Sequence, residues 1–122
     1  MDKKVALAAL AALAQETRLD VFRLLVHAGR KGMPSGEIGT RLDVRQNTMS
    51  ANLSVLLAAG LVRRERQGRS VRYFANIDGI GALLVFLSRE CCQGRVTLSG
   101  PGVEAFLDAA SADLTAKPEP VS

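Results

Sequence analysis

Two neighbouring cysteines, Cys91 and Cys92, are the residues of this chain best suited to hold a soft ligand. They stand at the end of a helix that the apolar spacing predicts at about Gly79–Cys92. Two adjacent thiolates can grip one thiophilic metal or metalloid, a centre that oxygen ligands serve poorly. The competing interpretation is structural, because Cys91 falls on the apolar stripe of the helix and buried free cysteine is common.

The segment Leu61–Arg72 is the second place where the side chains suggest chemistry. It holds five arginines and one acid, a local charge of +4, which equals the net charge of the whole 122-residue chain. Positive charge gathered on one β-ribbon suits a polyanion such as a nucleic-acid backbone. A solvated surface hairpin is the competing interpretation, but the neutral remainder of the chain favours the polyanion. The arginines expected on the backbone are Arg64, Arg66, Arg69 and Arg72.

A helix expected at about Gln46–Ala59 precedes this hairpin and has one apolar and one slender polar side. Its apolar residues recur at helical spacing: Met49, Leu53, Leu56 and Leu57. Exposed helix faces usually carry Lys and Glu, whereas this stretch holds no charged residue. A slim polar face fits the major groove of DNA. The residues that make up this slim face are Asn47, Ser50, Ala51 and Ser54.

Other helices must position these two surfaces. Patterning predicts one at about Lys3–Leu13, a second that begins at Thr17 as its N-cap and ends at Ala28, and a short third that Ser35 caps and Leu42 ends. In the second helix, the residues expected to face inward are Leu19, Phe22, Leu25 and Val26. A short helix, a turn, a second helix and a hairpin follow the order of a winged helix-turn-helix, so the predicted fold is mainly α with one β-hairpin.

Composition narrows the class of protein. With 13.0 kDa, 4% aromatic residues and no Trp, the chain is expected to form one domain with an aliphatic core at residues 1–95, followed by a partly disordered extension at 96–122. No apolar run reaches the roughly 18 residues of a membrane span, and no cleavage site follows Val5–Ala14, so a cytoplasmic protein is expected. His27 is the single histidine, which leaves an activated thiol without a base and argues against an enzyme or a catalytic cofactor.

Taken together, these motifs resemble the ArsR/SmtB family of bacterial metal- and metalloid-responsive repressors. The resemblance covers about residues 5–92 and rests on Leu13–Leu19, Gln46–Ser50 with Leu53 and Leu56-Leu57, Ala59–Val62, Arg66–Arg69 and Tyr73. It implies a homodimer joined through the first and last helices, bound to an imperfect palindrome in double-stranded DNA. It also implies that Ser35 and the hairpin arginines contact the backbone. The residues that it implies to face bases and phosphates are Gln46, Asn47, Thr48, Ser50, Ala51 and Ser54. Arg45 stands where the family often has a capping serine, so either Asp43 caps the helix or Arg45 itself contacts phosphate.

The resemblance also bears on the cysteines. The family's Cys-containing motif before the recognition helix is absent from Ser35–Leu42, whereas a pair at the end of the last helix resembles the arsenite-responsive members. Those members generally bring a third cysteine, and Ser99 stands near that position. The inducer is therefore expected to be arsenite or antimonite on two thiolates, or methylarsenite, which needs only two sulfurs. An unrelated or absent inducer and a thiol redox signal stay open, although a bridge between adjacent cysteines strains the peptide.

A winged-helix module that binds another protein is the remaining alternative to a DNA-binding repressor. Such a module does not need five arginines on its hairpin. It predicts little dependence of binding on salt, whereas DNA binding through several arginines weakens steeply as salt rises.

Overall fold

Helices dominate the computed structural model, which describes residues 1–92 and the side chains of residues 1–89. The helices are α1 (Lys3–Leu13), α2 (Glu16–Ala28), the 3₁₀ turn η1 (Gly29–Lys31), α3 (Ser35–Leu42), α4 (Gln46–Ala58) and α5 (Ile77–Cys92). The strands are β1 (Met33–Pro34), β2 (Val62–Gln67) and β3 (Ser70–Ala75). This is the expected winged helix-turn-helix, mainly α with a β-hairpin.

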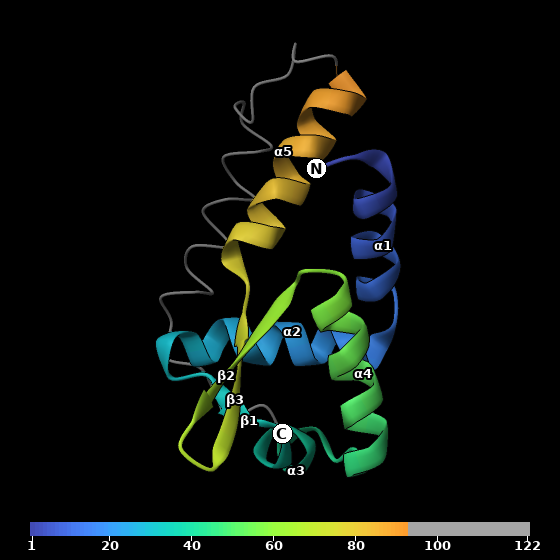
Figure 1. Ribbon diagram of the computed structural model, residues 1–122. Coiled ribbons are helices and arrows are strands. Elements are labelled where there is room, and N and C mark those ends of the chain that lie inside the picture. The colour runs from blue at the N-terminus through green and yellow to red at the C-terminus, as the bar shows by residue number, and fades with distance from the viewer. Residues whose placement is uncertain (93–122) are drawn as a thin grey trace.

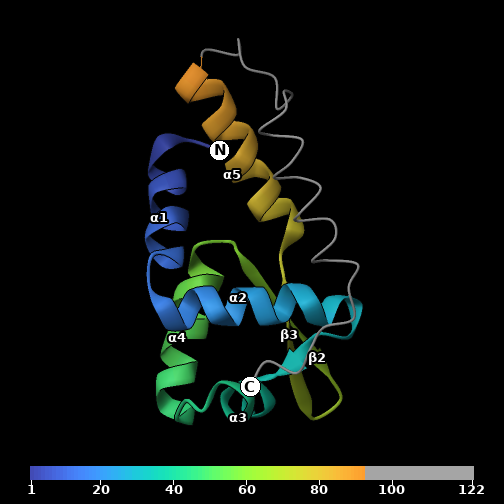
Figure 2. The same cartoon turned by 180° about the vertical axis from the view of Figure 1, so that it is seen from behind.

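The elements gather at two opposite ends of the molecule. In both views α1 and α5 lie beside each other at one end, while α3, the start of α4 and the tip of the β2–β3 hairpin lie at the other (Figures 1 and 2). Helix α2 crosses between the two ends and packs against α1, α3, α4 and β3. The predicted groove-reading helix and the arginine-rich hairpin therefore share one end.

Aliphatic side chains from nearly every element build the core. The largest fully buried ones include Val21 and Leu25 of α2, Ile38 of α3, and Leu61 before β2. Each buried residue of this size contributes about 1.5–3 kcal/mol by leaving water. The buried side of α4 belongs to this core, which fixes α4 relative to α1, α2 and β2.

The sheet has one strand more than the sequence predicted. Strand β3 lies in the middle, paired antiparallel with both β2 and β1. The two-residue strand β1 pairs Met33 with Tyr73 and Pro34 with Arg72, so it joins the loop before α3 to the root of the hairpin. A strand this short leaves no periodic signal in the sequence.

Helix α1 packs with its small residues inward. Its buried residues are Ala6, Ala9 and Ala12, whereas Leu7 is 58% exposed and Leu10 is also exposed. Alanine lets the helix approach its neighbours α2, α4 and α5 closely. The larger leucines are thus left on the outside of the chain.

Both predicted serine and threonine caps are wrong. Helix α2 begins at Glu16, and its N-cap is Gln15, whose side-chain oxygen accepts from the Arg18 amide at 2.8 Å. Helix α3 begins at Ser35 itself after Pro34, and no side chain caps it. In each case another residue with extended backbone occupies the cap position.

The predicted buried stripe of α2 is also partly wrong. Leu19 is exposed, and Val21 and Leu24 are buried beside the correctly predicted Phe22 and Leu25. The core contacts a broader side of α2 than a narrow stripe, because α1, α4 and β3 all pack against it.

The last helix begins two residues before the predicted start and ends where predicted, at Cys92. Within residues 1–92 no helix is long and apolar enough to cross a membrane. The predicted domain boundary at residue 95, the extension at 96–122 and Ser99 lie outside the residues that the structure describes.

Gly32 is expected to tolerate no side chain. Its φ is +59°, and a Cβ there would lie 2.6 Å from both a Phe74 ring carbon and the Tyr73 carbonyl oxygen. Gly32→Ala should lower the free energy of unfolding by about 1–3 kcal/mol, measured by urea denaturation. Gly36→Ala is the matched control, because its Cβ would meet nothing within 4 Å and its φ is ordinary. Equal stabilities of the two variants would contradict this account.

Candidate nucleic-acid interface

Helix α4 presents the polar side that the sequence predicted. Met49, Leu53 and Leu56 are buried against the core, so the opposite side of the helix faces solvent. The exposed side chains of α4 include the six of this helix that were expected at the DNA: Gln46, Asn47, Thr48, Ser50, Ala51 and Ser54. None of them is bulky or charged, and they begin at the end of α4 that lies beside α3.

The start of α4 is open to an anion. Its N-cap is Arg45, whose side chain is exposed and makes no capping hydrogen bond. Asp43 adopts a left-handed conformation (φ 54°) as the C-cap of α3, so it does not cap α4. The Thr48 amide is bonded to Asn47 Oδ1, which leaves the amides of Gln46 and Asn47 at this helix start. Amides at a helix start, next to an arginine, favour a phosphate oxygen.

Hydrogen bonds join α3 to α4 and orient two of the candidate side chains. The Gln46 side-chain amide donates to the Ser35 hydroxyl at 2.9 Å, which leaves the hydroxyl proton of Ser35 available to an outside acceptor. The Asn47 side-chain oxygen accepts from the Thr48 amide at 2.8 Å, so its NH₂ group is the part left for a partner.

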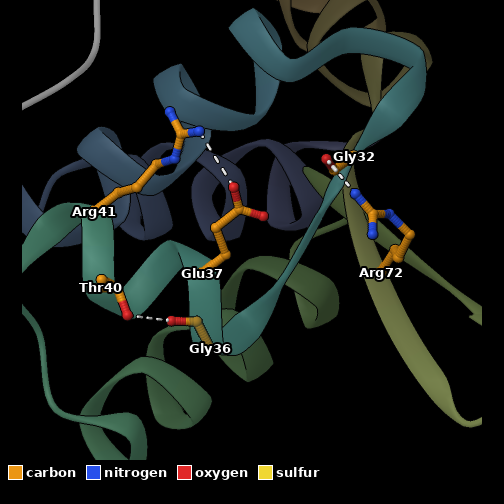
Figure 3. Close-up of polar contacts among 6 residues, drawn as sticks. All are labelled: Gly32, Gly36, Glu37, Thr40, Arg41 and Arg72. Atoms are coloured by element: carbon orange, nitrogen blue, oxygen red, sulfur yellow. Dashed lines mark hydrogen bonds and ion pairs between the residues drawn. The ribbon is translucent and has the colours of Figure 1, made fainter.

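Polar side chains on the exposed surface of α3 pair with other groups of the same helix. Arg41 pairs with Glu37 one turn earlier at 3.2 Å, and the Thr40 hydroxyl donates to the Gly36 carbonyl at 3.0 Å (Figure 3). Charge neutralised in this way adds little attraction for phosphate. The positive charge of this end therefore comes from Arg45 and from the hairpin.

The β2–β3 hairpin, called the wing below, divides its arginines between two faces. Cross-strand pairing sets Arg63 opposite Phe74 and Arg64 opposite Tyr73, on alternate sides of the sheet. The Arg63 guanidinium pairs with Glu65 and stacks 4.4 Å above the Phe74 ring, which is 3% exposed. Arg63 is therefore occupied within the protein.

Arg72 is held on that same face. Its Nε donates to the Lys31 carbonyl at 2.8 Å. Its Nη2 donates to the Gly32 carbonyl at 3.3 Å (Figure 3). These bonds tie β3 to the turn before β1 and fix the angle at which the wing leaves the core. A phosphate contact by Arg72 stays a prediction, and it would compete with these two carbonyls.

Three wing arginines are left for a partner. Arg64 and Arg66 are exposed on the face opposite Arg63, and Arg69 is exposed in the turn after Gly68, whose φ is +64°. Among the side chains that the structure describes, none of the three makes an ion pair. The tip of the hairpin that carries them lies at the end of the molecule where α4 begins (Figures 1 and 2).

One buried polar residue escaped the sequence interpretation. Asn52 of α4 is only 8% exposed, the one buried polar side chain within the described residues. Its Oδ1 accepts from the Arg18 Nη1 at 3.3 Å. The signal was present in the sequence, because Asn52 follows Met49 by three residues and so falls on the apolar side of α4.

The structure leaves the cysteine site untested. The backbone of Cys91 and Cys92 forms the end of α5, and their side chains lie outside the described part. Among the side chains described, no three His, Cys, Asp or Glu residues gather in a way that could hold a metal ion. His27 is half-buried in α2.

Sequence comparisons agree with this architecture. A helix-turn-helix domain family matches residues 13–65. A protein of Halobacterium salinarum named as an arsenical resistance operon repressor, ArsR, is 40% identical over 79 residues, which span 65% of this chain and 60% of that protein. The uncharacterized HTH-type transcriptional regulator YbzH of Bacillus subtilis is 33% identical over 91 residues and covered over 91% of its length. The transcriptional activator HlyU of Vibrio cholerae is 30% identical, with 75% of its length covered.

Solved structures agree as well. An ArsR-like transcriptional regulator from Rhodococcus sp. RHA1 superposes with a TM-score of 0.65 at 26% identity, covering 95% of this chain and 96% of its own. The homodimeric winged helix-turn-helix DNA-binding domain Mb0332 of Mycobacterium bovis gives 0.54 at 25% identity, covering 80% and 95%. HlyU of Vibrio cholerae, in a form described as reduced, gives 0.56 at 28% identity, covering 73% and 90%.

The division of the wing arginines predicts which of them set the dependence of DNA affinity on salt. Arg66→Ala should flatten the plot of log affinity against log salt by about 0.9, the slope of one phosphate contact. Arg63→Ala removes the same charge from the opposite face of the sheet. It should leave the slope unchanged because Arg63 already interacts with Glu65 and Phe74. The measurement is fluorescence anisotropy on a random-sequence duplex over a range of salt. Equal changes of slope would contradict the division.

Proposed function

We propose that this chain, which belongs to the ArsR family of winged helix-turn-helix transcriptional regulators, is a dimeric repressor of a metalloid-responsive operon. The chain is a DNA-binding regulator and not an enzyme. The proposal concerns the operon that the protein represses, the DNA site that it binds and the ligand that releases it. We propose that the protein acts in the cytoplasm on an imperfectly palindromic operator.

One observation carries the DNA part of the proposal: the uncharged side of α4 and three uncommitted arginines occupy the same end of the molecule. The slender side of α4 fits a major groove, where its first residues reach the base edges. Arg64, Arg66 and Arg69 of the wing then meet the adjoining backbone, as Ser35 and Arg45 do beside α4. This division of work gives sequence recognition to α4 and most of the salt-dependent affinity to the wing.

The opposite end supports a homodimer. Leu7 and Leu10 of α1 and Leu84 and Val85 of α5 are exposed, with Leu84 at 48%. Large aliphatic residues on two neighbouring helices make a patch that a second copy of the chain would cover. A two-fold axis there would hold two α4 helices on the same side of a duplex, about 34 Å apart, which is one turn of DNA.

Ala51→Glu tests the placement of α4 in the groove. A carboxylate there would face bases and phosphates, so we expect affinity for a duplex selected by the wild-type protein to fall at least a hundredfold, about 2.7 kcal/mol. Ala58→Glu is the matched control: it lies seven residues further along the same side of α4, about 10 Å from Ala51. Its effect should be below tenfold. Similar losses in both variants would reject this placement, and electrophoretic titration measures them.

The proposed inducer is a trivalent arsenic or antimony species bound by Cys91 and Cys92. The adjacent thiols and the 40% identity to a protein named as an arsenical resistance operon repressor support it. Two sulfurs suffice for methylarsenite and give arsenite or antimonite a weaker site than three would. Ser99 would be the nearest candidate for a further ligand, and a hydroxyl is a poor substitute for a thiolate.

The mechanism would be negative linkage between ligand and DNA. Both cysteines stand at the end of α5, a helix proposed to lie in the dimer interface. A ligand that moves this end would change the separation of the two α4 helices and so weaken the operator complex. A coupling of about 3 kcal/mol would lower operator affinity more than a hundredfold, and DNA would weaken the ligand equally.

Replacing both cysteines with serine should separate the two activities. Cys91→Ser/Cys92→Ser should bind the selected duplex as tightly as the wild type, and methylarsenite or arsenite should no longer release it. The single variants show whether both sulfurs are needed. Wild-type protein whose DNA affinity is unchanged by trivalent arsenic would refute the inducer.

A thiol redox signal is the second candidate, favoured by the likeness to HlyU, for which a structure of the reduced protein exists. Treatment with hydrogen peroxide instead of arsenic, followed by the same titration, distinguishes the two. Release by oxidant alone would favour this candidate.

A further inference from the structure

Arg18, in the first turn of α2, joins three helices. Its Nε donates to the Ala12 carbonyl at 2.7 Å and its Nη2 to the Ala11 carbonyl at 3.5 Å, both at the end of α1. Its Nη1 donates to Asn52 Oδ1 in α4 at 3.3 Å. We propose that Arg18 is a positioning residue for DNA recognition, which fixes α4 relative to α1 by holding Asn52 and the last carbonyls of α1 in one guanidinium fork.

Arg18 adds donors at the end of α1. The last carbonyls of a helix carry partial negative charge and need partners beyond the regular helix bonds. The Ala11 carbonyl also accepts from the Ala14 amide at 3.2 Å, so the shorter bond to Ala12 is the main contribution of Arg18. The last turn of α1 contains no basic residue of its own. Arg18 supplies the charge from another helix, and the planar fork directs two donors at α1 and a third at α4.

Within the described residues, the bond to Arg18 is the one side-chain hydrogen bond that Asn52 makes. It is buried among Met49, Leu53 and Leu56 on the core side of α4, where an apolar residue of its size would pack without a partner. A buried amide is stable there only because its oxygen is paired. A buried polar residue that packing does not require can fix the position of its helix. Here the Arg18–Asn52 bond forms only when α4 lies at one position relative to the end of α1, which the same guanidinium contacts.

This inference rests on the proposed function. There, α1 belongs to the dimer interface and α4 reads the groove, so the α1–α4 position sets the separation of the two reading helices. A rigid Arg18 fork would make the two reading helices fit one spacing of half-sites. Loosening it should therefore weaken sequence-specific binding more than binding through the wing, whose arginines are untouched.

The experiment compares two duplexes of equal length: a palindrome selected from a random pool by the wild-type protein, and a random sequence. Asn52→Leu keeps the size and removes the acceptor, while Asn52→Asp keeps an acceptor for Arg18. Arg18→Lys keeps the charge but not the fork. Arg23→Lys is its control, because Arg23 is exposed on α2 and makes no side-chain hydrogen bond within the described residues.

We expect Asn52→Leu and Arg18→Lys to lower affinity for the palindrome at least tenfold and affinity for the random duplex less than twofold. Asn52→Asp and Arg23→Lys should stay within threefold of wild type on both. The double variant Arg18→Lys/Asn52→Leu should bind the palindrome no more weakly than the weaker-binding single variant, since both changes remove the same Arg18–Asn52 bond. Unfolding curves fix an assay temperature at which every variant is folded.

Equal losses on the two duplexes, additive losses in the double variant, or no loss would overturn the positioning role. Should Asn52→Leu not fold, Asn52→Ala removes the acceptor without adding bulk and takes its place. A wild-type protein that selects no sequence from the pool would overturn the proposed function and this inference with it. A selective wild type with unaffected variants would overturn the inference alone.

Discussion

Burial of one side of α4 is the constraint on which the rest of the interface depends. Met49, Leu53 and Leu56 pack against α1, α2 and β2, so the rotation of the helix about its axis is fixed. A turn of 100° would expose a leucine and bury Ser50 in one direction or Thr48 in the other, each at a cost of about 1–3 kcal/mol. The small polar residues on the other side are therefore aimed outward by the core, and side-chain hydrogen bonds further orient Gln46 and Asn47.

The arginines show how partners within the protein decide which charges are offered outward. Arg63 and Arg72 lie on the sheet face that also carries the buried Phe74, and both are taken up by internal partners. A guanidinium already bonded to carbonyls or stacked on a ring must lose those contacts before it can bind phosphate. The local charge of the hairpin thus overstates what a polyanion would meet, and in the proposed complex Arg64, Arg66 and Arg69 would supply the larger part of the attraction.

Periodicity and charge predicted most of the fold and the interface. The bounds of α1 and α4, the wing strands and the exposed side of α4 were readable because each is set by local spacing. The strand β1 and the inward side of α2 were not, because neighbours far away in the sequence decide them. The caps at Gln15 and Pro34 are local, but they differ by one or two residues from the serine and threonine that capping preferences favour. Arg18 and Asn52 are 34 residues apart, and no local pattern pairs two such residues. The cysteine site is a different case, since its side chains lie beyond those described.

Alanine on the inner side of α1 links the two ends of the molecule. Small residues there let α1 lie close enough to α2 and α4 for its last carbonyls to reach Arg18, whose fork also holds Asn52. The same packing turns Leu7 and Leu10 outward, where only a partner would cover them. Had leucine faced inward, α1 would stand further from α4, the fork would not span the gap, and the outer side would be too poor in apolar area to hold a second copy. The proposed dimer surface and the fixed position of α4 then follow from one choice of residue size.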